Sequence, residues 1–309
     1  MIAFGPVPSR RLGRSLGINN IPHKACTYAC LYCQVGLTTS KDATRRCFYP
    51  PEQIHGAVSE HLSRVEGAVD YLSFVPDGEP TLDINLGGSI DRLRTLGIPV
   101  AVITNASLLW REDVREELSR ADWVSLKVDA AEEPVWKRLN RPNPHLDFAT
   151  MQQGIHEFAG SFAGELVTET MLVEAVNDGE EHLRKVADAI ASLKPQKAYL
   201  SIPTRPPAVE WARAPDAGTV NRAYQMFRRS IPQVECLTGY EGDAFATTGD
   251  FEKDVLGITA VHPLREEAVR QMCGRDGAEW TQLESLLEKD VLVRVRYEGE
   301  TYYLRKWKR

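Results

Sequence analysis

Three cysteines near the start of the chain, Cys26, Cys30 and Cys33, follow one another at C-x3-C-x2-C spacing. Three thiolates so close together on one loop match the ligands of an iron–sulfur cluster, because such clusters are held mainly by cysteine. A cluster kept only for structure or electron transfer is expected to have four protein ligands, so a set of three leaves one iron open for another molecule. The alternatives are a zinc knuckle or free thiols, but zinc sites usually bring four ligands in paired motifs.

An aromatic residue, Tyr32, precedes the last of these cysteines, and with it the loop resembles the signature of the radical S-adenosylmethionine (SAM) superfamily. The resemblance implies a [4Fe–4S] cluster whose open iron binds the amino and carboxylate groups of SAM. It also implies that the reduced cluster cleaves SAM to methionine and a 5′-deoxyadenosyl radical, which abstracts hydrogen from an unreactive C–H bond. The expected electron donor is a ferredoxin or flavodoxin.

The composition is that of an ordinary globular protein, with 43% hydrophobic and 26% charged residues in a chain of 309. No apolar run approaches the ~18–20 residues of a membrane span, and the N-terminus lacks the basic and apolar regions of a signal peptide. We therefore expect a cytoplasmic protein with no membrane partner, whose scattered Cys47, Cys236 and Cys273 are structural thiols rather than a second cluster. The net charge of −6 predicts no global attraction to nucleic acid, so any basic surface must be local.

Short β-branched segments alternate with amphipathic segments along most of the chain, which is typical of an α/β fold with a parallel sheet. The predicted strands cover residues 15–21, 71–75, 100–104, 123–128, 166–174 and 198–202. The predicted helices cover residues 52–65, 89–96, 111–119, 149–158 and 180–192. Six such units are too few for an eight-stranded barrel. They match the partial (β/α)6 barrel of the radical SAM family, and the resemblance covers residues 1–245.

The pattern changes near residue 248, and residues 246–309 are predicted to form a separate small domain. Segments 261–273 and 278–288 are predicted to be helices, and the segment from 291 onward is predicted to be a hairpin. This order resembles a winged helix-turn-helix. From Val291 to Arg309 the chain has six Lys or Arg against two Glu, with Tyr302, Tyr303 and Trp307 among them. A basic hairpin with aromatic residues fits nucleic-acid contact, but winged helices also bind proteins or pack on their own chain.

A motif after the second predicted strand, Val75-Pro-Asp-Gly-Glu-Pro-Thr, resembles the family's "GE" motif at Gly78, Glu79 and Pro80, whose residues recognise the SAM amino group. An ammonium group needs acceptors, and glycine lets the backbone approach a ligand closely. Alone, Asp-Gly-Glu-Pro is a common turn, but its place one strand after the cysteine loop favours the functional interpretation. The third strand ends at Asn105, where many family members have a Thr-Asn-Gly turn and this chain has Ala106 instead of the glycine.

Three polar residues, Ser125, Lys127 and Asp129, alternate on one face of the fourth predicted strand. Polar side chains inside a barrel are costly unless they have partners, so this face predicts a polar ligand. If SAM is that ligand, Lys127 would pair with its carboxylate, and Ser125 and Asp129 would bond its ribose hydroxyls. The alternative is an internal Lys127–Asp129 ion pair with no ligand role.

Further polar residues are candidates for the substrate side of the site. Thr168-Glu-Thr alternates on the fifth predicted strand, and Arg205 follows the sixth in a loop that is otherwise typical of a surface turn. Near the N-terminus, Arg10, Arg11 and Arg14 suit a phosphate or carboxylate through the planar guanidinium. A solvated basic loop is the competing interpretation.

Four segments, beginning at Phe4, Ser125, Arg138 and Ala260, resemble a poorly characterised group of radical SAM Fe–S oxidoreductases. That group is similar to the wyosine-forming tRNA enzymes, which carry additional cysteines ahead of the SAM motif. This chain has none before Cys26, so the resemblance carries over the fold and the SAM chemistry but not the substrate.

Three hypotheses for the function remain. Modification of RNA, such as tRNA, is favoured by the basic hairpin. Modification of a protein or peptide, such as glycyl-radical activation, is favoured by the compact size and single cluster. An Fe–S redox-sensing DNA-binding regulator would have no use for Gly78, Glu79 and Lys127. No residue is assigned as catalytic, because in such enzymes the cofactor supplies the hard chemistry.

Overall fold

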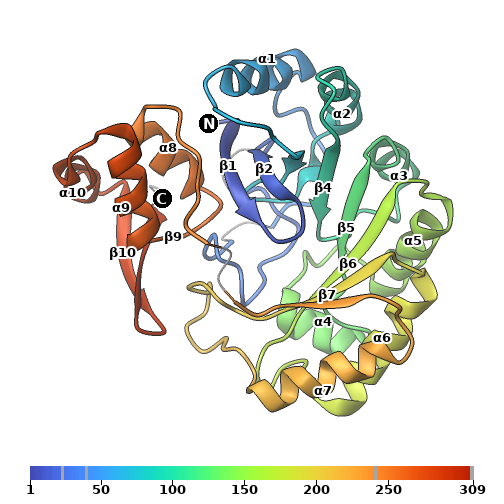
Figure 1. Ribbon diagram of the computed structural model, residues 1–309. Coiled ribbons are helices and arrows are strands. Elements are labelled where there is room, and N and C mark those ends of the chain that lie inside the picture. Colours follow the sequence, from blue (N-terminus) through green and yellow to red (C-terminus); the bar gives the residue numbers. More distant parts are fainter. Residues whose placement is uncertain (22–23, 39–40, 240–241, 307–309) are drawn as a thin grey trace.

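An eight-stranded sheet curls into a half-barrel at the centre of the molecule (Figure 1). The computed structural model describes residues 1–21, 24–38, 41–239 and 242–306. The strands lie in chain order, β1 is antiparallel to β2, and β2 to β8 are parallel to one another. Their bounds are β1 (Ala3–Ser9), β2 (Gly13–Ile18), β3 (Tyr71–Phe74), β4 (Val100–Thr104), β5 (Trp123–Lys127), β6 (Glu165–Met171), β7 (Lys197–Ser201) and β8 (Val234–Leu237). The predicted α/β class is confirmed.

Helices cover the outside of the curled sheet (Figure 1). They are α1 (Pro51–Leu62), α2 (Leu86–Arg94), α3 (Glu112–Leu118), α5 (Phe148–Ser161), α6 (Glu180–Leu193) and α7 (Ala217–Arg228). In α6, Leu183, Val186 and Ile190 recur at three- and four-residue spacing and are buried. Each such burial contributes about 1.5–3 kcal/mol. Two further helical segments, α4 (Glu133–Asn140) and the 3-10 turn η1 (Pro80–Leu82), lie between a strand and its outer helix.

The sheet has two strands more than the sequence predicts. The edge strand β1 contains Pro6 and Pro8, which cannot donate to a ladder and are tolerated at an edge. The strand β8 has only four residues and includes Glu235, so it gives little periodic signal. The expectation that the strand pattern ends near residue 202 is therefore wrong. The helices α4 and α7 were also not predicted.

The inside of the half-barrel changes from apolar to polar along the strands. Trp123 of β5 and Tyr199 of β7 belong to an apolar cluster near the amino ends. Along β5, Ser125 and Lys127 follow Trp123 on the same inward face. Leu126 points the other way, into the core beneath the helices. The polar residues thus gather at the carboxyl ends of the strands, the end that carries the active sites of related barrels.

Three helices and a small antiparallel sheet follow the half-barrel and form what we term the C-terminal module, residues 246–306. Its elements are α8 (Phe251–Ile258), β9 (Leu264–Arg265), α9 (Glu266–Asp276), α10 (Trp280–Glu288), β10 (Leu292–Tyr297) and β11 (Glu300–Arg305), with strand order β10-β11-β9. The helix expected from Val261 begins only at Glu266, because Pro263 disfavours helical backbone before it and lacks an N–H. The helix α8 was not predicted.

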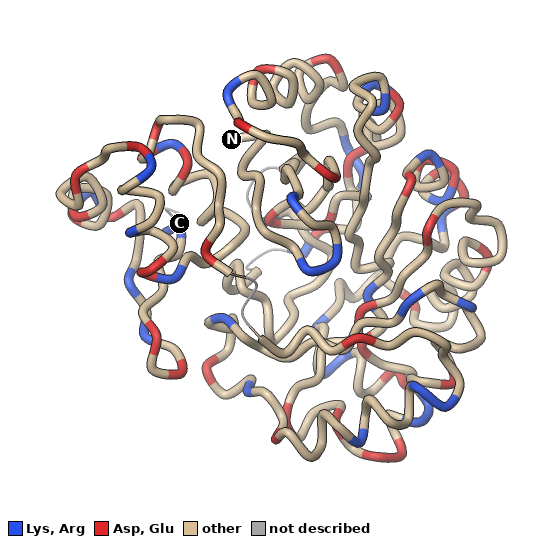
Figure 2. The backbone as a smooth tube through the Cα atoms, in the orientation of Figure 1, with Lys and Arg blue, Asp and Glu red and all other residues tan. Residues whose placement is uncertain are grey.

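The C-terminal module packs on the β1 edge of the half-barrel. Phe4 of β1 joins Phe251, Val255 and Leu264 in one hydrophobic cluster, and Ala246 N donates a hydrogen bond of 2.9 Å to the Pro6 carbonyl. Figure 2 shows acidic and basic residues mixed over the module. The domain boundary at residue 246 stays a prediction, and Trp307, Lys308 and Arg309 lie outside the described residues. No helix in the described part of the chain is long and apolar enough to cross a membrane.

Candidate cofactor site

The three cysteines line one cavity at the carboxyl ends of the parallel strands. The cavity has a volume of about 290 Å³. Its wall combines Cys26, Cys30 and Cys33 with residues at the ends of β4, β5, β6 and β7, namely Thr104, Lys127, Met171 and Ser201. The cysteine loop is therefore placed against the strand ends, where a ligand would contact both.

Each cysteine sulfur accepts a hydrogen bond. The donors are Tyr28 N (3.5 Å) and Asn105 Nδ2 (3.8 Å) to Cys26 Sγ, Asn140 Nδ2 (3.5 Å) to Cys30 Sγ, and Lys24 Nζ (3.4 Å) to Cys33 Sγ. Donors aimed at sulfur stabilise thiolates and tune the clusters that thiolates hold. The surroundings thus suit three ionised ligands.

Without a cation the thiols of Cys26 and Cys30 resist ionisation. Burial, and then the neighbouring Cys30, raises the pKa of Cys26 far above its usual range. Burial raises the pKa of Cys30 to about 12, although the hydrogen bond from Asn140 works in the opposite direction. A bound metal group would supply the positive charge that offsets three thiolates, since metal binding displaces protons from cysteine.

The arrangement suits a cluster better than a single ion. Among the described side chains, no three His, Cys, Asp or Glu residues form a group that could hold one metal ion. A zinc ion needs its ligands to converge on one point, whereas an iron–sulfur cube accepts each thiolate at a different iron. Three cysteines spread over one cavity wall, with no fourth described cysteine beside them, therefore fit the cluster.

Gly78 packs against the cysteine loop so closely that no side chain would fit. A Cβ at this position would lie 2.0 Å from the Ala25 carbonyl oxygen. The next residue, Glu79, donates its backbone N–H to the same oxygen at 2.9 Å. Gly78 and Glu79 line the cavity, whereas Pro80 begins the turn η1 and does not. The predicted motif is therefore fixed directly to the loop of the cysteines.

The carboxylate of Glu79 is buried and joins the motif to the end of β4. It accepts hydrogen bonds from Thr81 N and Oγ1, from Thr104 Oγ1 at 2.6 Å and from Asn105 N at 2.8 Å. Burial raises the pKa of Glu79, and the bonds from Thr104 and Asn105 oppose that rise. These contacts identify Glu79 as a residue that positions Asn105, whose amide in turn reaches Thr27 at 2.8 Å.

The turn after β4 has the backbone that the family pattern predicts. Ala106 has φ of 63°, in the left-handed region that favours glycine. An L-residue there costs roughly 1–2 kcal/mol, and the buried Thr104 hydroxyl compensates by accepting the Ala106 N–H at 3.0 Å. The replacement of glycine by alanine therefore leaves the turn intact.

Lys127 lies among acidic and aromatic groups at the end of β5. Its Nζ is 3.1 Å from Glu169 Oε1, 3.4 Å from Asp129 Oδ1 and 5.0 Å from the centre of the Tyr32 ring. Burial lowers the pKa of Lys127, but Asp129 and Glu169 outweigh it and hold the pKa above its usual range. The lysine thus remains a cation in the cavity wall, and the internal ion pair that was the alternative is present beside the site.

The other two residues predicted on this face do not line the cavity. Asp129 accepts hydrogen bonds from Tyr32 Oη, Asn140 Nδ2 (2.9 Å) and Met171 N (2.8 Å). Ser125 is fully buried beneath Lys127, and its Oγ has no hydrogen-bond partner among the described residues. Tyr32, Lys127, Gly78, Glu79 and Asn105 are thus brought together, while Pro80, Ser125 and Asp129 support them from outside the cavity.

The sequence did not predict the pairing of Arg11 with Glu169. Arg11 lies in the turn between β1 and β2, and its guanidinium forms an ion pair with Glu169 inside the cavity. Despite burial, Arg11 and Lys127 lower the pKa of Glu169 to about 2. The neighbouring Arg10 bonds the Cys236 and Gly239 carbonyls, and Arg14 bonds Glu66 and Ala68. Only one of the three predicted arginines therefore faces the site.

The C-terminal module reaches the cavity through the residue that follows Cys33. Gln34 Nε2 donates to the Val261 carbonyl at 2.9 Å, and Arg205 Nη1 donates to Gln34 Oε1 at 2.8 Å. Gln34 and Arg205 both line the cavity. The loop after β7 and the module thus meet at the cysteine loop.

Comparisons with known proteins identify relatives in sequence and in fold. The sequence profile of the radical SAM superfamily matches residues 20–190. A UPF0026 protein of Methanocaldococcus jannaschii is 41% identical over 307 residues, covering 98% of this chain and 96% of the relative. A UPF0026 protein of Synechocystis sp. is 33% identical over 238 residues, covering 76% of this chain and 87% of the relative.

Two solved structures show a similar fold. TYW1 with a lysine-pyruvate adduct bound has a TM-score of 0.56 and 14% identity, covering 71% of this chain and 74% of the other. SuiB of Streptococcus suis bound to the precursor peptide SuiA has a TM-score of 0.54 and 13% identity, covering 71% of this chain and 47% of the other. At such low identity the likeness concerns the fold alone.

Proposed function

The chain belongs to the radical SAM superfamily and is an iron–sulfur enzyme, and from this premise we propose that Cys26, Cys30 and Cys33 hold a [4Fe–4S] cluster beside a SAM site in the same cavity. One observation carries the proposal: three cysteines with hydrogen-bonded sulfurs line one cavity with Gly78, Glu79 and a partly buried lysine, Lys127. When bound, the reduced cluster and SAM supply a 5′-deoxyadenosyl radical that abstracts hydrogen from a C–H bond.

Different residues of the cavity bind different groups of SAM. Lys127, kept cationic by its acidic neighbours, attracts the SAM carboxylate. The carboxylate of Glu79 is already used by Thr81, Thr104 and Asn105, so backbone carbonyls of the Gly78–Glu79 turn are the acceptors for the SAM ammonium and Glu79 positions them. Asp129 and Ser125, the predicted ribose partners, lie behind the cavity wall, so we propose that they support the wall rather than contact the ribose.

A winged-helix assignment of the C-terminal module belongs to the proposal. The order α8-β9-α9-α10-β10-β11 and the sheet order β10-β11-β9 support it. Tyr297 Oη donates to the Pro203 carbonyl at 3.2 Å and Tyr302 Oη to the Thr204 carbonyl at 3.1 Å. These bonds place the module over the loop that borders the cavity, where it shields the radical from water.

RNA is the first substrate class that we propose. Arg294 and Arg296 lie exposed on one face of β10, and exposed arginines on a hairpin suit phosphate contact. The enzyme would act in the cytoplasm with a ferredoxin or flavodoxin as electron donor.

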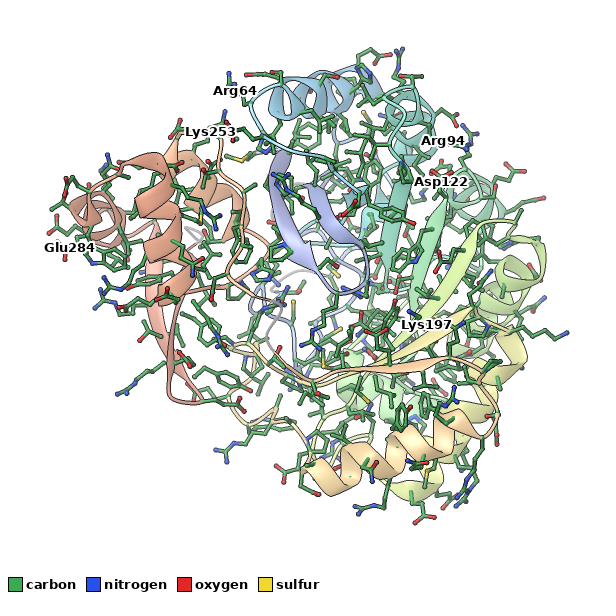
Figure 3. All side chains as sticks on the ribbon, viewed as in Figure 1. Arg64, Arg94, Asp122, Lys197, Lys253 and Glu284 are labelled. Carbon is green, nitrogen blue, oxygen red and sulfur yellow. The ribbon has the colours of Figure 1, made fainter. Side chains whose placement is uncertain are left out.

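A protein or peptide is the second candidate, because α10 carries no basic residue. Its exposed side chains are Thr281, Gln282, Glu284 and Glu288, and Glu284 points away from the half-barrel (Figure 3). The corresponding helix of a DNA-binding helix-turn-helix enters the major groove, where this acidic face would meet phosphate repulsion. The same observation counts against a DNA-binding regulator.

The test is reductive cleavage of SAM by the anaerobically reconstituted protein with dithionite. Slow release of 5′-deoxyadenosine and methionine without substrate is the expected result, and Cys30→Ala should abolish it. A protein that carries its cluster but releases no 5′-deoxyadenosine would overturn the proposal.

A further inference from the structure

Three basic residues adjoin the cysteine loop and do not line the cavity. We term Lys41, Arg138 and Arg141 the cluster-side patch. Lys41 forms a parallel β-bridge with Cys26, and its Nζ donates to the Pro142 carbonyl at 2.9 Å, next to Arg141. Arg138 lies three residues earlier, in the last turn of α4. The three residues therefore lie at one end of α4.

Only one layer of backbone separates this patch from the cysteines. The Ala29 N–H, directly before Cys30, donates to the carbonyls of Asn140 (3.0 Å) and Arg141 (3.3 Å). The Asn140 side chain reaches Cys30 Sγ at 3.5 Å. A partner seated on Arg141 would thus lie one peptide layer from a cluster ligand, and electron transfer slows steeply with distance.

The charges of the patch are uncompensated. Arg138 and Arg141 are exposed, and within the described residues neither they nor Lys41 form an ion pair. Two acidic residues close to the patch in the sequence already have partners: Asp42 pairs with Arg46 at 3.4 Å, and Glu133 pairs with Lys137 at 2.7 Å. Such a group of three cations stands out on a chain of net charge −6. The cysteine loop adds an apolar element, because Leu37 is 57% exposed.

We propose that the cluster-side patch is the docking site of the protein that delivers the electron, and that this donor presents an acidic surface. The inference rests on the proposed cluster. One electron leaves the donor, which is oxidised, and enters the cluster, which is reduced. The cavity side of the loop is occupied by the SAM residues and bordered by the C-terminal module, so the outer side is the open approach. Complementary charge speeds such encounters.

The variant Arg138→Glu/Arg141→Glu tests the patch and leaves Lys41, which contacts the loop, unchanged. Its matched control is Arg228→Glu/Arg229→Glu, because these exposed arginines also lie at the C-terminal end of a helix, α7. The probe is a flavodoxin reduced by NADPH and its reductase. Two quantities are measured at low salt, the flavodoxin dissociation constant and the rate of cluster reduction.

In the patch variant we expect binding and flavodoxin-driven reduction to fall about tenfold or more, with unchanged iron content and unchanged reduction by dithionite. The control variant should behave like the native protein. In the native protein, flavodoxin-driven reduction should slow as salt rises, because salt screens exposed charges. Dithionite needs no docking, so a native protein that fails with dithionite refutes the proposed function rather than the patch.

Equal flavodoxin affinity in the native and patch proteins would overturn the inference. A native reduction rate that does not change with salt would also overturn it, and this measurement needs no variant to fold. If the patch variant instead lost affinity for tRNA while keeping its affinity for flavodoxin, the surface would be a nucleic-acid site and the inference would be wrong.

Discussion

Charged residues are arranged in opposite ways in the cofactor cavity and on the C-terminal module. In the cavity, the side chains of Lys127 and Glu169 are only 14% and 11% exposed and share a pair at 3.1 Å. On the module, Lys306 and Asp290 also pair, but their side chains are 45% and 65% exposed. Exposed pairs contribute only about 0–1 kcal/mol. Buried charges are costly, so a network of them is weak evidence for stability and better evidence for a ligand.

The cofactor cavity and the C-terminal module are therefore under different structural constraints. Few substitutions fit around the cavity. Gly78 packs on the Ala25 carbonyl of the cysteine loop, and the buried Glu79 carboxylate accepts a hydrogen bond from Asn105 N. Acidic and basic residues are interspersed along the backbone of the module (Figure 2). Substitutions should therefore affect cofactor binding on the first side and substrate binding on the second.

The largest effect is expected at Gly78. The Cβ of Gly78→Ala would lie 2.0 Å from the Ala25 carbonyl oxygen, so the cysteine loop would have to move and most of the iron should be lost. Gly56→Ala is the control, because no described atom lies within 4 Å of its Cβ, and alanine favours a helix by roughly 0.5–1 kcal/mol. Iron and sulfide analysis compares the two. Equal iron content would contradict the tight packing.

Removing the C-terminal module should separate the role of the cavity from the role of the module. A protein ending at residue 245 should hold its cluster and cleave SAM but lose turnover on the true substrate. Lower solubility is expected, because Phe4 and Val7 would be left without their packing partners.

Two tyrosine substitutions test the same contact without exposing Phe4 and Val7. Tyr297→Phe/Tyr302→Phe removes the bonds to the Pro203 and Thr204 carbonyls, together with the bond that Tyr302 accepts from Arg265 within the module. It should lower turnover while sparing SAM cleavage. Loss of SAM cleavage in this double variant would mean that the module is part of the cofactor site.

The SAM contacts should show an intermediate effect. Lys127→Ala removes a charged partner of SAM, a loss of about 1.5–3 kcal/mol, or about ten- to a hundredfold in SAM affinity. Glu79→Ala should also weaken SAM binding, because it releases the backbone that the Glu79 carboxylate positions. Calorimetry on the cluster-loaded protein measures both effects. Lys197→Ala is the control, since Lys197 lies at the amino end of β7 and pairs with Glu235 at 3.2 Å. Native affinity in both site variants would remove their assigned roles.

The smallest effect is expected on the module hairpin. If RNA is the substrate, Arg294→Gln/Arg296→Gln should weaken its binding and reduce the salt slope by about two units, one for each arginine that no longer neutralises a phosphate. Lys306 is left unchanged because it pairs with Asp290, and Lys308 lies outside the described residues. If the salt slope of RNA binding does not change, the remaining roles for the module are binding a protein or covering the cavity.

Features that depend only on neighbouring residues were the ones best predicted from the sequence. The cysteine spacing and the strand at residues 100–104 depend on neighbouring residues, and the structure places this strand at the predicted bounds. The proline-containing β1 and the short β8 gave no periodic signal. The pairing of Arg11 with Glu169 joins residues far apart in the chain, and only the curl of the sheet brings them together. Among Arg10, Arg11 and Arg14, the sequence offered no reason to choose Arg11.

The central claim is that three cysteines alone hold the cluster. Anaerobic reconstitution followed by iron and sulfide analysis tests it most directly. The native protein should bind about four irons and four sulfides, and Cys26→Ala, Cys30→Ala or Cys33→Ala should abolish this binding. The triple variant Cys47→Ala/Cys236→Ala/Cys273→Ala should keep all of it. Loss of half or more of the iron in that triple variant would reveal a second cluster and contradict the account.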